Sequence, residues 1–373
     1  MSQPKRSVFV QALAAIASPF YRIGVNFRNF LFNSDILKSR QYAMPIISVG
    51  NITVGGTGKT PHAEFILSFL SPKIKVALLS RGYKRKSVGY VLANENSTAE
   101  DLGDEPYQIH KKFPDIYVAV DKDRMHAIEI LTKEHPEVGV AVMDDGYQYR
   151  YIEPGLNILL IDYNRPMHED SLLPLGQLRE PIHNKSRANL IIVTKCPDNA
   201  TPMDYRLIQK HINPSPYQPL YFSKIEYGEL YPMDEVGEVV TKKMLNADKY
   251  GVLVLTGIED GSHLAKYISG FADTTRTISF PDHHNYTAED IKTIQNAFEK
   301  IPNDEKIIVT TEKDSARLSS SKFLDEELKS RIYVLPIEVK ILFDKEEEFK
   351  KLILDYVKKN TTNNRLSQKT DRH

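Results

Sequence analysis

The chain has 373 residues, of which 41% are hydrophobic and 26% charged, a composition typical of a folded globular protein that excludes general disorder. Its 49 Lys and Arg residues equal its 49 Asp and Glu residues, so no overall positive field attracts nucleic acid, and we expect no nucleic-acid partner. The length predicts two domains, and the single cysteine, Cys196, excludes an intramolecular disulfide framework and favours a reducing compartment such as the cytoplasm.

The first predicted element is an amphipathic helix within an N-terminal segment, residues 1–35. The first forty residues hold six basic residues and a single acid, Asp35, so this end is cationic. Large apolar residues recur at alternating steps of four and three, which places them on one helix face: Phe9, Leu13, Ile16, Phe20, Ile23, Phe27 and Phe30. Polar residues interrupt the segment too often for a membrane-spanning helix, and it lacks the small-residue cleavage site of a signal peptide.

An apolar stripe beside arginine suits the surface of an anionic membrane leaflet, so we expect this segment to lie in the membrane interface. Pro19 should kink the segment or break it into two shorter helices. The alternative is a helix that packs its apolar stripe on the protein's own core.

From residue 46 onward, short apolar runs alternate with amphipathic stretches, which is the pattern of β-α-β units. The runs of the first half are Ile46–Val49, Val76–Ser80, Ile116–Val120, Val138–Met143, Ile158–Ile161 and Leu190–Val193. Continuous apolar strands separated by helices predict a mostly parallel sheet flanked by helices, with ligands at the carboxyl ends of the strands. We therefore expect an α/β core domain over residues 36–230.

The second half of the chain predicts a smaller domain. Turn residues accumulate around residues 215–245, where we expect a linker. The alternation then resumes with the runs Val252–Leu255, Thr277–Phe280, Ile307–Thr310 and Ile332–Leu335. These runs predict a second α/β domain over residues 231–357. Residues 358–373 are polar and without periodicity, and we expect a disordered tail there.

A glycine-rich loop follows the first apolar run and precedes a helical stretch, Ala63–Leu70. Its residues are Thr53, Val54, Gly55, Gly56, Thr57, Gly58, Lys59 and Thr60. In a P-loop the glycines turn backbone N–H groups toward phosphate oxygens, Lys59 reaches the β- and γ-phosphates, and Thr60 ligates Mg²⁺. Thr53 departs from the usual first glycine, and the alternative is an ordinary glycine-rich turn. The Gly-Lys-Thr ending in this strand, loop and helix context favours a nucleotide site, so we expect residues 36–230 to form a nucleotide-binding core domain of the P-loop kinase-like class.

Two acids, Asp144 and Asp145, directly follow the apolar run Val138–Met143. A carboxylate at the end of a buried strand, on the same sheet edge as a P-loop, is where an acid binds Mg²⁺ directly or through water. The alternative is a plain Asp-Gly turn, because Gly146 comes next.

A basic cluster follows the second apolar run. Arg81, Lys84, Arg85 and Lys86 surround Tyr83. Such a run is either a solvated loop or a platform for an anionic lipid or nucleotide.

Six short motifs occur in a fixed order along the chain. They are Ser48–Pro61, which holds the P-loop, and Ser80–Tyr83, Gly103–Pro106, Asp144–Gln148, Leu178–Pro181 and Phe280–His283. Together they resemble the tetraacyldisaccharide 4′-kinase family over roughly residues 5 to 350, and their joint occurrence is far more specific than the P-loop alone.

The resemblance implies which residues bind the cofactors. Lys59 and the rest of the P-loop would hold ATP. Thr60 and the acidic pair, Asp144 and Asp145, would hold Mg²⁺, and Glu180 would be a further metal ligand at the phosphoryl-transfer site.

The resemblance also implies the catalytic residues. Asp104 would be the base that takes the proton of the acceptor hydroxyl, and His283 would support it from the second domain. Arg179 would join Lys59 at the phosphoryl-transfer site, and Arg124 could contact the phosphate already on the acceptor. The pair Tyr149–Arg150 departs from the histidine more frequent in the family. Taken singly, each motif also fits a helix cap, a surface ion pair or a turn.

The function implied by the resemblance is an ATP- and Mg²⁺-dependent kinase. It would transfer the γ-phosphate of ATP to the 4′-hydroxyl of a tetraacylated disaccharide 1-phosphate in lipid A biosynthesis. Because this substrate is half lipid, the N-terminal stripe would hold the enzyme at the cytoplasmic side of the bacterial inner membrane as a peripheral or monotopic protein, and we expect no protein partner. The alternative is a membrane-associated P-loop GTPase or ATPase switch, since Thr194–Asp198 resembles a guanine-reading Thr-Lys-x-Asp motif with the aspartate one place late.

Overall fold

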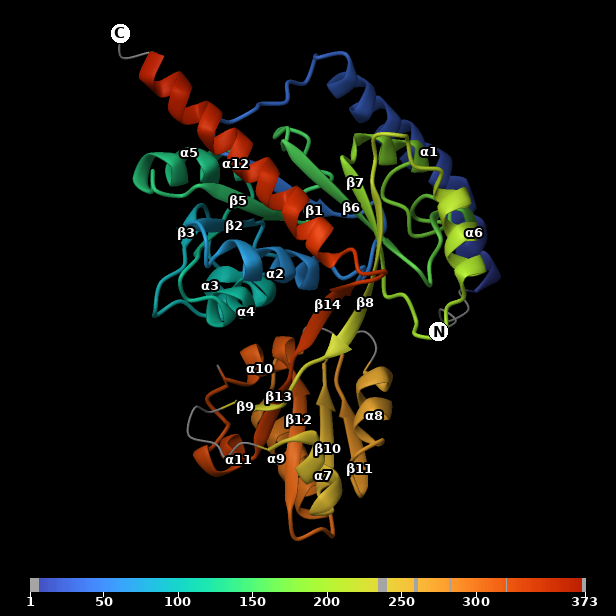
Figure 1. The fold of residues 1–373 in the computed structure, drawn as a ribbon. Coiled ribbons are helices and arrows are strands. Elements are labelled where there is room, and N and C mark those ends of the chain that lie inside the picture. The colour runs from blue at the N-terminus through green and yellow to red at the C-terminus, as the bar shows by residue number, and fades with distance from the viewer. Residues whose placement is uncertain (1–6, 234–239, 258–260, 282–283, 320, 371–373) are drawn as a thin grey trace.

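The computed structural model describes residues 7–233, 240–257, 261–281, 284–319 and 321–370, without the side chains of residue 8 and of residues 361–370. Within these ranges the chain forms a nine-stranded and a five-stranded sheet, each with helices packed on it. Figure 1 shows the two sheets one above the other, with a long helix from each end of the chain lying on the larger domain. This arrangement is the α/β fold with a second, smaller α/β domain that the sequence predicts.

The larger sheet has the strand order β14-β8-β7-β6-β1-β5-β2-β4-β3. Its neighbouring strands are parallel, except that the two edge strands, β14 and β3, are antiparallel to their partners. The strands are β1 (Ile46–Gly50), β2 (Val76–Ser80), β3 (Val91–Leu92), β4 (Tyr117–Val120), β5 (Val140–Asp144), β6 (Leu156–Asp162), β7 (Leu190–Thr194), β8 (Leu220–Tyr227) and β14 (Ile337–Ile341). Because β1 and β5 are parallel neighbours, the P-loop and the acidic pair leave the sheet at the same edge.

Successive side chains of each central strand enter two separate cores. On one face, Ile47 and Val142 pack with helices α2 (Lys59–Leu70) and α12 (Glu346–Thr370). On the other face, Ile46 and Ala141 pack with α5 (Arg124–Glu134). The remaining helices of this domain are α1 (Val8–Asn33), α3 (Ala99–Leu102), α4 (Asp104–Lys112), η1 (Met167–Glu169), η2 (Ile182–Arg187) and α6 (Pro202–Ile212). Burial on both faces explains why the strands are continuous apolar runs.

The smaller sheet has the strand order β11-β10-β12-β13-β9, parallel except for β9. Its strands are β9 (Tyr231–Pro232), β10 (Gly251–Thr256), β11 (Thr274–Ser279), β12 (Lys306–Thr311) and β13 (Ile332–Leu335). Its helices are α7 (Lys242–Ala247), α8 (Ser262–Ile268), α9 (Ala288–Glu299), α10 (Glu312–Leu318) and α11 (Glu326–Ser330). Helices α7 and α8 share one core of this domain, and α9 and α11 share the other.

After the smaller sheet the chain returns to the larger one, which the sequence analysis does not anticipate. Strand β14 pairs with β8, and α12 buries Phe349, Ile353 and Val357 in the core of the larger sheet. These segments belong to the larger domain, although the sequence analysis assigns residues up to 357 to the second one. Strands β8 and β9 also lie within the predicted linker, and α12 continues to residue 370, beyond the predicted start of a disordered tail.

Helix α1 docks on the larger domain through a face other than its apolar stripe, and this docked face buries Ala14, Ser18 and Phe32. Ser18 Oγ donates to Leu172 O and Tyr21 OH donates to Arg179 O, each at 3.0 Å. The seven residues of the apolar stripe face outward instead, with exposed fractions between 52% and 72%. The stripe therefore does not pack on the protein's own core. The helix runs through Pro19 without breaking into two shorter helices, and none of the described helices combines the length and apolarity needed to span a bilayer.

Tyr356 of α12 ties the returning helix to the first strand, and this contact can be tested. Its hydroxyl lies 3.1 Å from the carbonyl oxygen and 3.2 Å from the amide nitrogen of Ile46. Tyr356→Phe should lower the free energy of unfolding by about 1 to 2 kcal/mol, because buried backbone groups lose a hydrogen-bond partner. Urea unfolding measures the change. Tyr217→Phe is the matched control, since that side chain is 93% exposed, and an equal effect there would contradict the assignment.

Candidate active site

The loop between β1 and α2 has the backbone geometry of a phosphate cradle. Gly55 and Gly58 adopt positive φ angles of 90° and 85°, a region that glycine enters readily and most other residues avoid. Helix α2 begins at Lys59, directly after the loop, so its free N–H groups and the positive end of its dipole face the loop. An anion placed there meets backbone donors and positive potential together.

The acidic pair lies against the end of this loop. Thr60 Oγ1 is 3.4 Å from Asp144 Oδ2, and Lys59 Nζ is 3.7 Å from Asp145 Oδ1. Arg179 approaches from another loop, with Nη1 3.3 Å from Asp145 Oδ2. The structure thus brings together five residues that the sequence analysis assigns to nucleotide binding, metal binding or catalysis.

Asp144 is buried, and burial raises the pKa of its carboxyl group to about 7. The carboxylates of Asp145 and Glu105 raise this pKa further, whereas the ammonium group of Lys59 lowers it. A bound cation would stabilise the ionised form of a carboxyl group that is buried beside another carboxylate.

A Mg²⁺ ion fits the donor set at the end of the loop. The Thr60 hydroxyl and the Asp144 carboxylate are hard oxygen ligands, and Mg²⁺ in kinase sites takes most of its other ligands from phosphates and water. Within the described ranges, no three His, Cys, Asp or Glu side chains form a metal cage of their own. The protein's share of the coordination would therefore come from Thr60 and the acidic pair.

Glu180 is engaged in a different way from the acidic pair. Its Oε2 accepts a hydrogen bond from Asn184 at 2.7 Å and lies 2.8 Å from Arg187 Nη2. Its Oε1 is buried and has no hydrogen-bond partner among the described residues. Metal ligation by Glu180 stays a prediction, because one of its oxygens is already committed to Arg187.

The outer side of the P-loop is held by residues that the sequence analysis missed. Lys195 Nζ donates to Gly56 O and lies 3.0 Å from Asp162 Oδ2. Arg165 Nη1 donates to Val54 O at 3.3 Å, and its Nη2 is 3.1 Å from the same Asp162 oxygen. One buried carboxylate thus aligns two cations whose N–H groups hold carbonyls of the loop. With these carbonyls engaged, the loop is fixed in one orientation.

The strand-end motif Thr194–Asp198 takes part in this support. Thr194 Oγ1 donates to Thr57 O at 2.9 Å, next to the Lys195 contact. Asp198, the acid of the motif, is exposed and lies 2.9 Å from Lys224 Nζ. Thr194 and Lys195 of the weak guanine-reading motif therefore support the P-loop, and together with Asp162 and Arg165 we call them the brace. Lys195 could have been found from the sequence, because it directly follows the end of a predicted strand.

Asp104 begins helix α4 at the junction with the second domain. Its Oδ2 accepts a hydrogen bond from Arg317 Nη2 of α10 at 2.7 Å. His283, the predicted partner of Asp104, lies outside the described residues. The sequence does not single out Arg317. The signal that could have found it is the polar segment Thr311–Asp314 at the end of β12, because ligands bind at the carboxyl ends of parallel strands and Arg317 follows in the next helix.

Arg124 is buried below Tyr149, with its guanidinium 4.6 Å from the ring centroid. Burial lowers the pKa of Arg124, and the nearby carboxylates of Asp145 and Asp144 oppose this shift. The residue is thus within electrostatic range of the acidic pair, and its contact with an acceptor phosphate stays a prediction.

The basic cluster after β2 is partly structural. Arg85 donates to Val120 O at 3.2 Å, and Lys86 forms an ion pair with Glu100. Lys84 lies 5.7 Å from the centroid of the Tyr83 ring. Arg85 therefore ties this loop to β4, and the role of the cluster as a platform for an anionic ligand stays a prediction.

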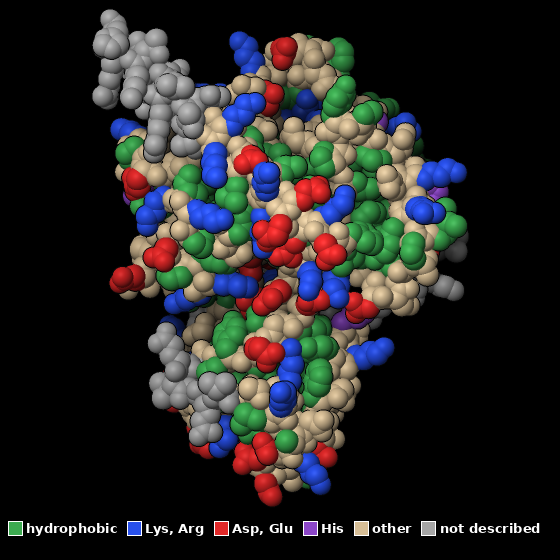
Figure 2. All heavy atoms as spheres, viewed as in Figure 1, with side chains coloured by type: hydrophobic (Ala, Val, Ile, Leu, Met, Phe, Trp, Pro, Cys, Tyr) green, Lys and Arg blue, Asp and Glu red, His purple; other side chains and the backbone are tan. Residues whose placement is uncertain are grey.

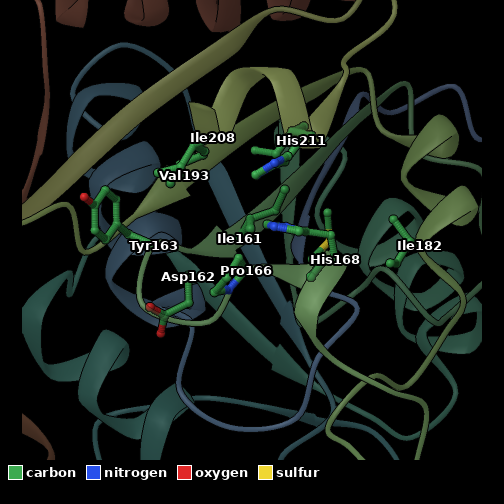
Figure 3. A pocket seen from close by; sticks show the side chains of 11 residues that line it. Ile161, Asp162, Tyr163, Pro166, His168, Ile182, Val193, Ile208 and His211 are labelled. Atoms are coloured by element: carbon green, nitrogen blue, oxygen red, sulfur yellow. The ribbon is translucent and has the colours of Figure 1, made fainter. Parts of the chain in front are cut away.

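A hollow lies beside the brace and not at the phosphate cradle. Its lining comes mainly from β6, β7, α6, η1 and the start of η2 and is mainly apolar. Figure 3 shows His168 and His211 on one side of it and the Asp162 carboxylate turned away from them. The two imidazole rings lie 3.9 Å apart. None of the residues predicted for the active site lines this hollow.

The model of the family described as tetraacyldisaccharide-1-P 4′-kinase matches residues 10–358. The chain belongs to this family. The tetraacyldisaccharide 4′-kinase of Phocaeicola vulgatus is 49% identical over 349 residues, which cover 93% of this chain and 95% of the relative. That of Bacteroides thetaiotaomicron is 44% identical and covered to 95% of both chains.

A solved structure supports the same assignment. The crystal structure of the "apo" form of LpxK from Aquifex aeolicus in complex with ATP has a TM-score of 0.71 and 29% sequence identity, and the match covers 93% of this chain and 99% of that one. The resemblance noted from the motifs, the fold and the enzyme class, a kinase, are thereby confirmed. Membership of this family decides against the GTPase or ATPase switch.

Lys59 is the first residue to test at this site. Lys59→Ala should lower kcat by at least about a hundredfold, because it removes the positive charge that meets the transferring phosphoryl group, while the fold survives. Initial rates and a thermal melt measure both quantities. Lys73→Ala, at an exposed position just after the same helix, is the control. Near-normal turnover of a folded Lys59→Ala variant would refute the P-loop assignment.

The brace makes a separate prediction. Lys195→Met should weaken ATP binding by about tenfold, which corresponds to about 1.4 kcal/mol, because Gly56 O loses its donor and the loop gains freedom. Titration calorimetry with ATP measures the affinity. Lys133→Met on the exposed side of α5 should leave it unchanged. Equal ATP affinities for Lys195→Met and the wild type would show that the brace does not order the loop.

Proposed function

We propose that this protein transfers the γ-phosphoryl group of ATP to the 4′-hydroxyl of a tetraacylated disaccharide 1-phosphate. The carrying observation is the convergence of Lys59, Thr60, Asp144, Asp145 and Arg179 at one sheet edge in a chain that belongs to the 4′-kinase family. The bond between the bridging oxygen and the γ-phosphorus breaks, a bond from the acceptor oxygen to that phosphorus forms, and ADP leaves.

The P-loop and the acidic pair divide the work of holding ATP. Backbone N–H groups of the loop and Lys59 bind the β- and γ-phosphates. Thr60 and the acidic pair would hold Mg²⁺, which when bound would neutralise charge on the same phosphates. Lys59 and Arg179 both lie against Asp145, so the three side chains form an ordered group of charges around the reacting phosphate.

Asp104 takes the proton of the acceptor hydroxyl. A sugar hydroxyl is a poor nucleophile, and a positioned carboxylate contributes on the order of 10² to 10⁴ in rate. Glu105, the next residue in α4, is close enough to raise the pKa of Asp144. This supports a position of Asp104, in the same first turn of α4, near the acidic pair. His283 remains a candidate partner of this base.

The outward stripe of α1 holds the protein at the cytoplasmic face of the bacterial inner membrane. Its seven apolar side chains are exposed although the rest of the helix is docked, so the stripe is available to enter the headgroup boundary of a bilayer. The substrate's acyl chains lie in that bilayer, and the helix contacts the loop that carries Arg179.

The test of function uses ATP labelled at the γ-phosphate and the acylated disaccharide 1-phosphate in mixed micelles. Thin-layer chromatography should show a labelled lipid with a second phosphate, and omission of Mg²⁺ should abolish it. Release of labelled inorganic phosphate without labelled lipid would contradict the proposed acceptor and favour a nucleotide hydrolase.

The membrane role is tested separately by Phe20→Asp combined with Phe27→Asp. These residues are 71% and 60% exposed, so the changes should leave the fold intact while reducing vesicle binding by more than about tenfold. Sedimentation with vesicles of anionic lipid measures binding, and nucleotide affinity confirms the fold. Phe323→Asp is the matched control, since that phenylalanine is 56% exposed in the second domain. Full sedimentation of the α1 variant after a salt wash would contradict the role.

A further inference from the structure

Helix α4 of the larger domain and helix α10 of the smaller one are joined by ion pairs along their lengths. Arg317 Nη2 lies 2.7 Å from Asp104 Oδ2, and Lys313 Nζ lies 3.1 Å from Glu105 Oε1. At the far end of α4, Lys112 Nζ lies 2.7 Å from Glu312 Oε1. Figure 2 shows acidic and basic side chains intermixed across the waist between the two domains. The two helices therefore meet in a defined register.

The centre of this contact is apolar. Ala316 of α10 is buried in one cluster with Leu102 and Tyr107 of the larger domain. Because Ala316 precedes Arg317 directly, this packing fixes where the arginine emerges from α10. The position of Arg317 is thus set by close packing, and a surface ion pair alone would not set it.

Arg317 is also anchored within its own domain. Its Nη1 lies 3.4 Å from Gly257 O and 3.6 Å from Asp314 Oδ1. Asp314 is in turn held by the amide of Gly257 at 2.9 Å and by Thr311 Oγ1 at 2.8 Å. The Arg317 side chain is only 5% exposed, so one end of its guanidinium group belongs to the second domain while the other end reaches Asp104.

The pair with Asp104 involves the group to which the proposed function assigns proton transfer. A carboxylate has about four lone-pair directions on its two oxygens, so one bond from a guanidinium is compatible with accepting a proton from a substrate. One N–H group of Arg317, on Nη2, makes this bond, while Nη1 is held within the second domain.

We propose that Arg317 is a positioning residue that completes the catalytic base from the second domain. The inference rests on the proposed function and adds to it: Asp104 is held in its working orientation only while α10 is docked on α4. The second domain then contributes to proton transfer through Arg317, in addition to any role of His283.

The experiment compares kcat, and KM for ATP, in the full-length enzyme with the labelled lipid assay. Arg317→Met should lower kcat by about 30-fold to 100-fold and leave KM for ATP within about threefold, because the base is misplaced while the P-loop is untouched. Arg317→Lys keeps the charge and should recover most of the loss, and it also serves if Arg317→Met is unstable. Asp104→Ala combined with Arg317→Met should be barely worse than Asp104→Ala, since the two residues act as one unit.

Lys112→Met is the matched control. It breaks another ion pair between the same two helices, at the end of α4 remote from Asp104, and should lower thermal stability while changing kcat by less than about threefold. An equal loss of kcat in Lys112→Met and Arg317→Met would assign the effect to domain docking in general and overturn the inference. Losses that multiply fully in the double variant would also overturn it. Near-normal turnover of Asp104→Ala would remove both the base and the inference, while labelled lipid product from the wild type would leave the kinase function standing.

Discussion

A buried carboxylate beside a second carboxylate is the arrangement on which the rest of the active site depends. Burial and the charge of Asp145 both raise the pKa of Asp144, whereas the ammonium group of Lys59 lowers it and so favours the ionised form that binds a metal ion. Lys59 comes from the start of α2, and Arg179 from the loop before η2. The P-loop, the end of β5 and the Arg179 loop therefore meet through attraction between these cations and the Asp145 carboxylate. Each of the three segments is placed by its own backbone contacts.

Support for these groups extends outward in two directions. Asp162 aligns Lys195 and Arg165 on the outer side of the P-loop, and neither cation has to touch the nucleotide. On the other side, Arg317 reaches Asp104 from the second domain. On the P-loop side, the Asp162 carboxylate orients two cations, and on the domain side the Arg317 guanidinium orients a carboxylate. The orienting side chain is in each case held by contacts within its own domain. Such preorganisation limits the movement needed during phosphoryl transfer.

Local pattern predicts much of this molecule. The continuous apolar runs give the central strands of both sheets, because strands buried on both faces admit few polar residues, and the glycines with Lys59 and Thr60 give the phosphate cradle. Strand β14 escapes detection because it is an edge strand that alternates buried and exposed residues, and only tertiary packing brings it back beside β8. The Asp104 and Arg317 pair is separated by 213 residues, so it depends on domain docking that no local pattern records. The roles of His283 and Glu180 stay predictions.

Helix α1 is attached to the body by hydrogen bonds to the very loops that present active-site residues. Tyr21 binds the carbonyl of Arg179, and Arg28 binds the carbonyl of Gln148 at 3.1 Å. Because α1 is attached in this way, the distance between its outer apolar stripe and the active site is fixed. If the stripe lies on a bilayer, the enzyme meets an acylated acceptor by lateral diffusion in the plane of that bilayer. The acceptor hydroxyl then reaches the nucleotide at one fixed distance from the membrane surface.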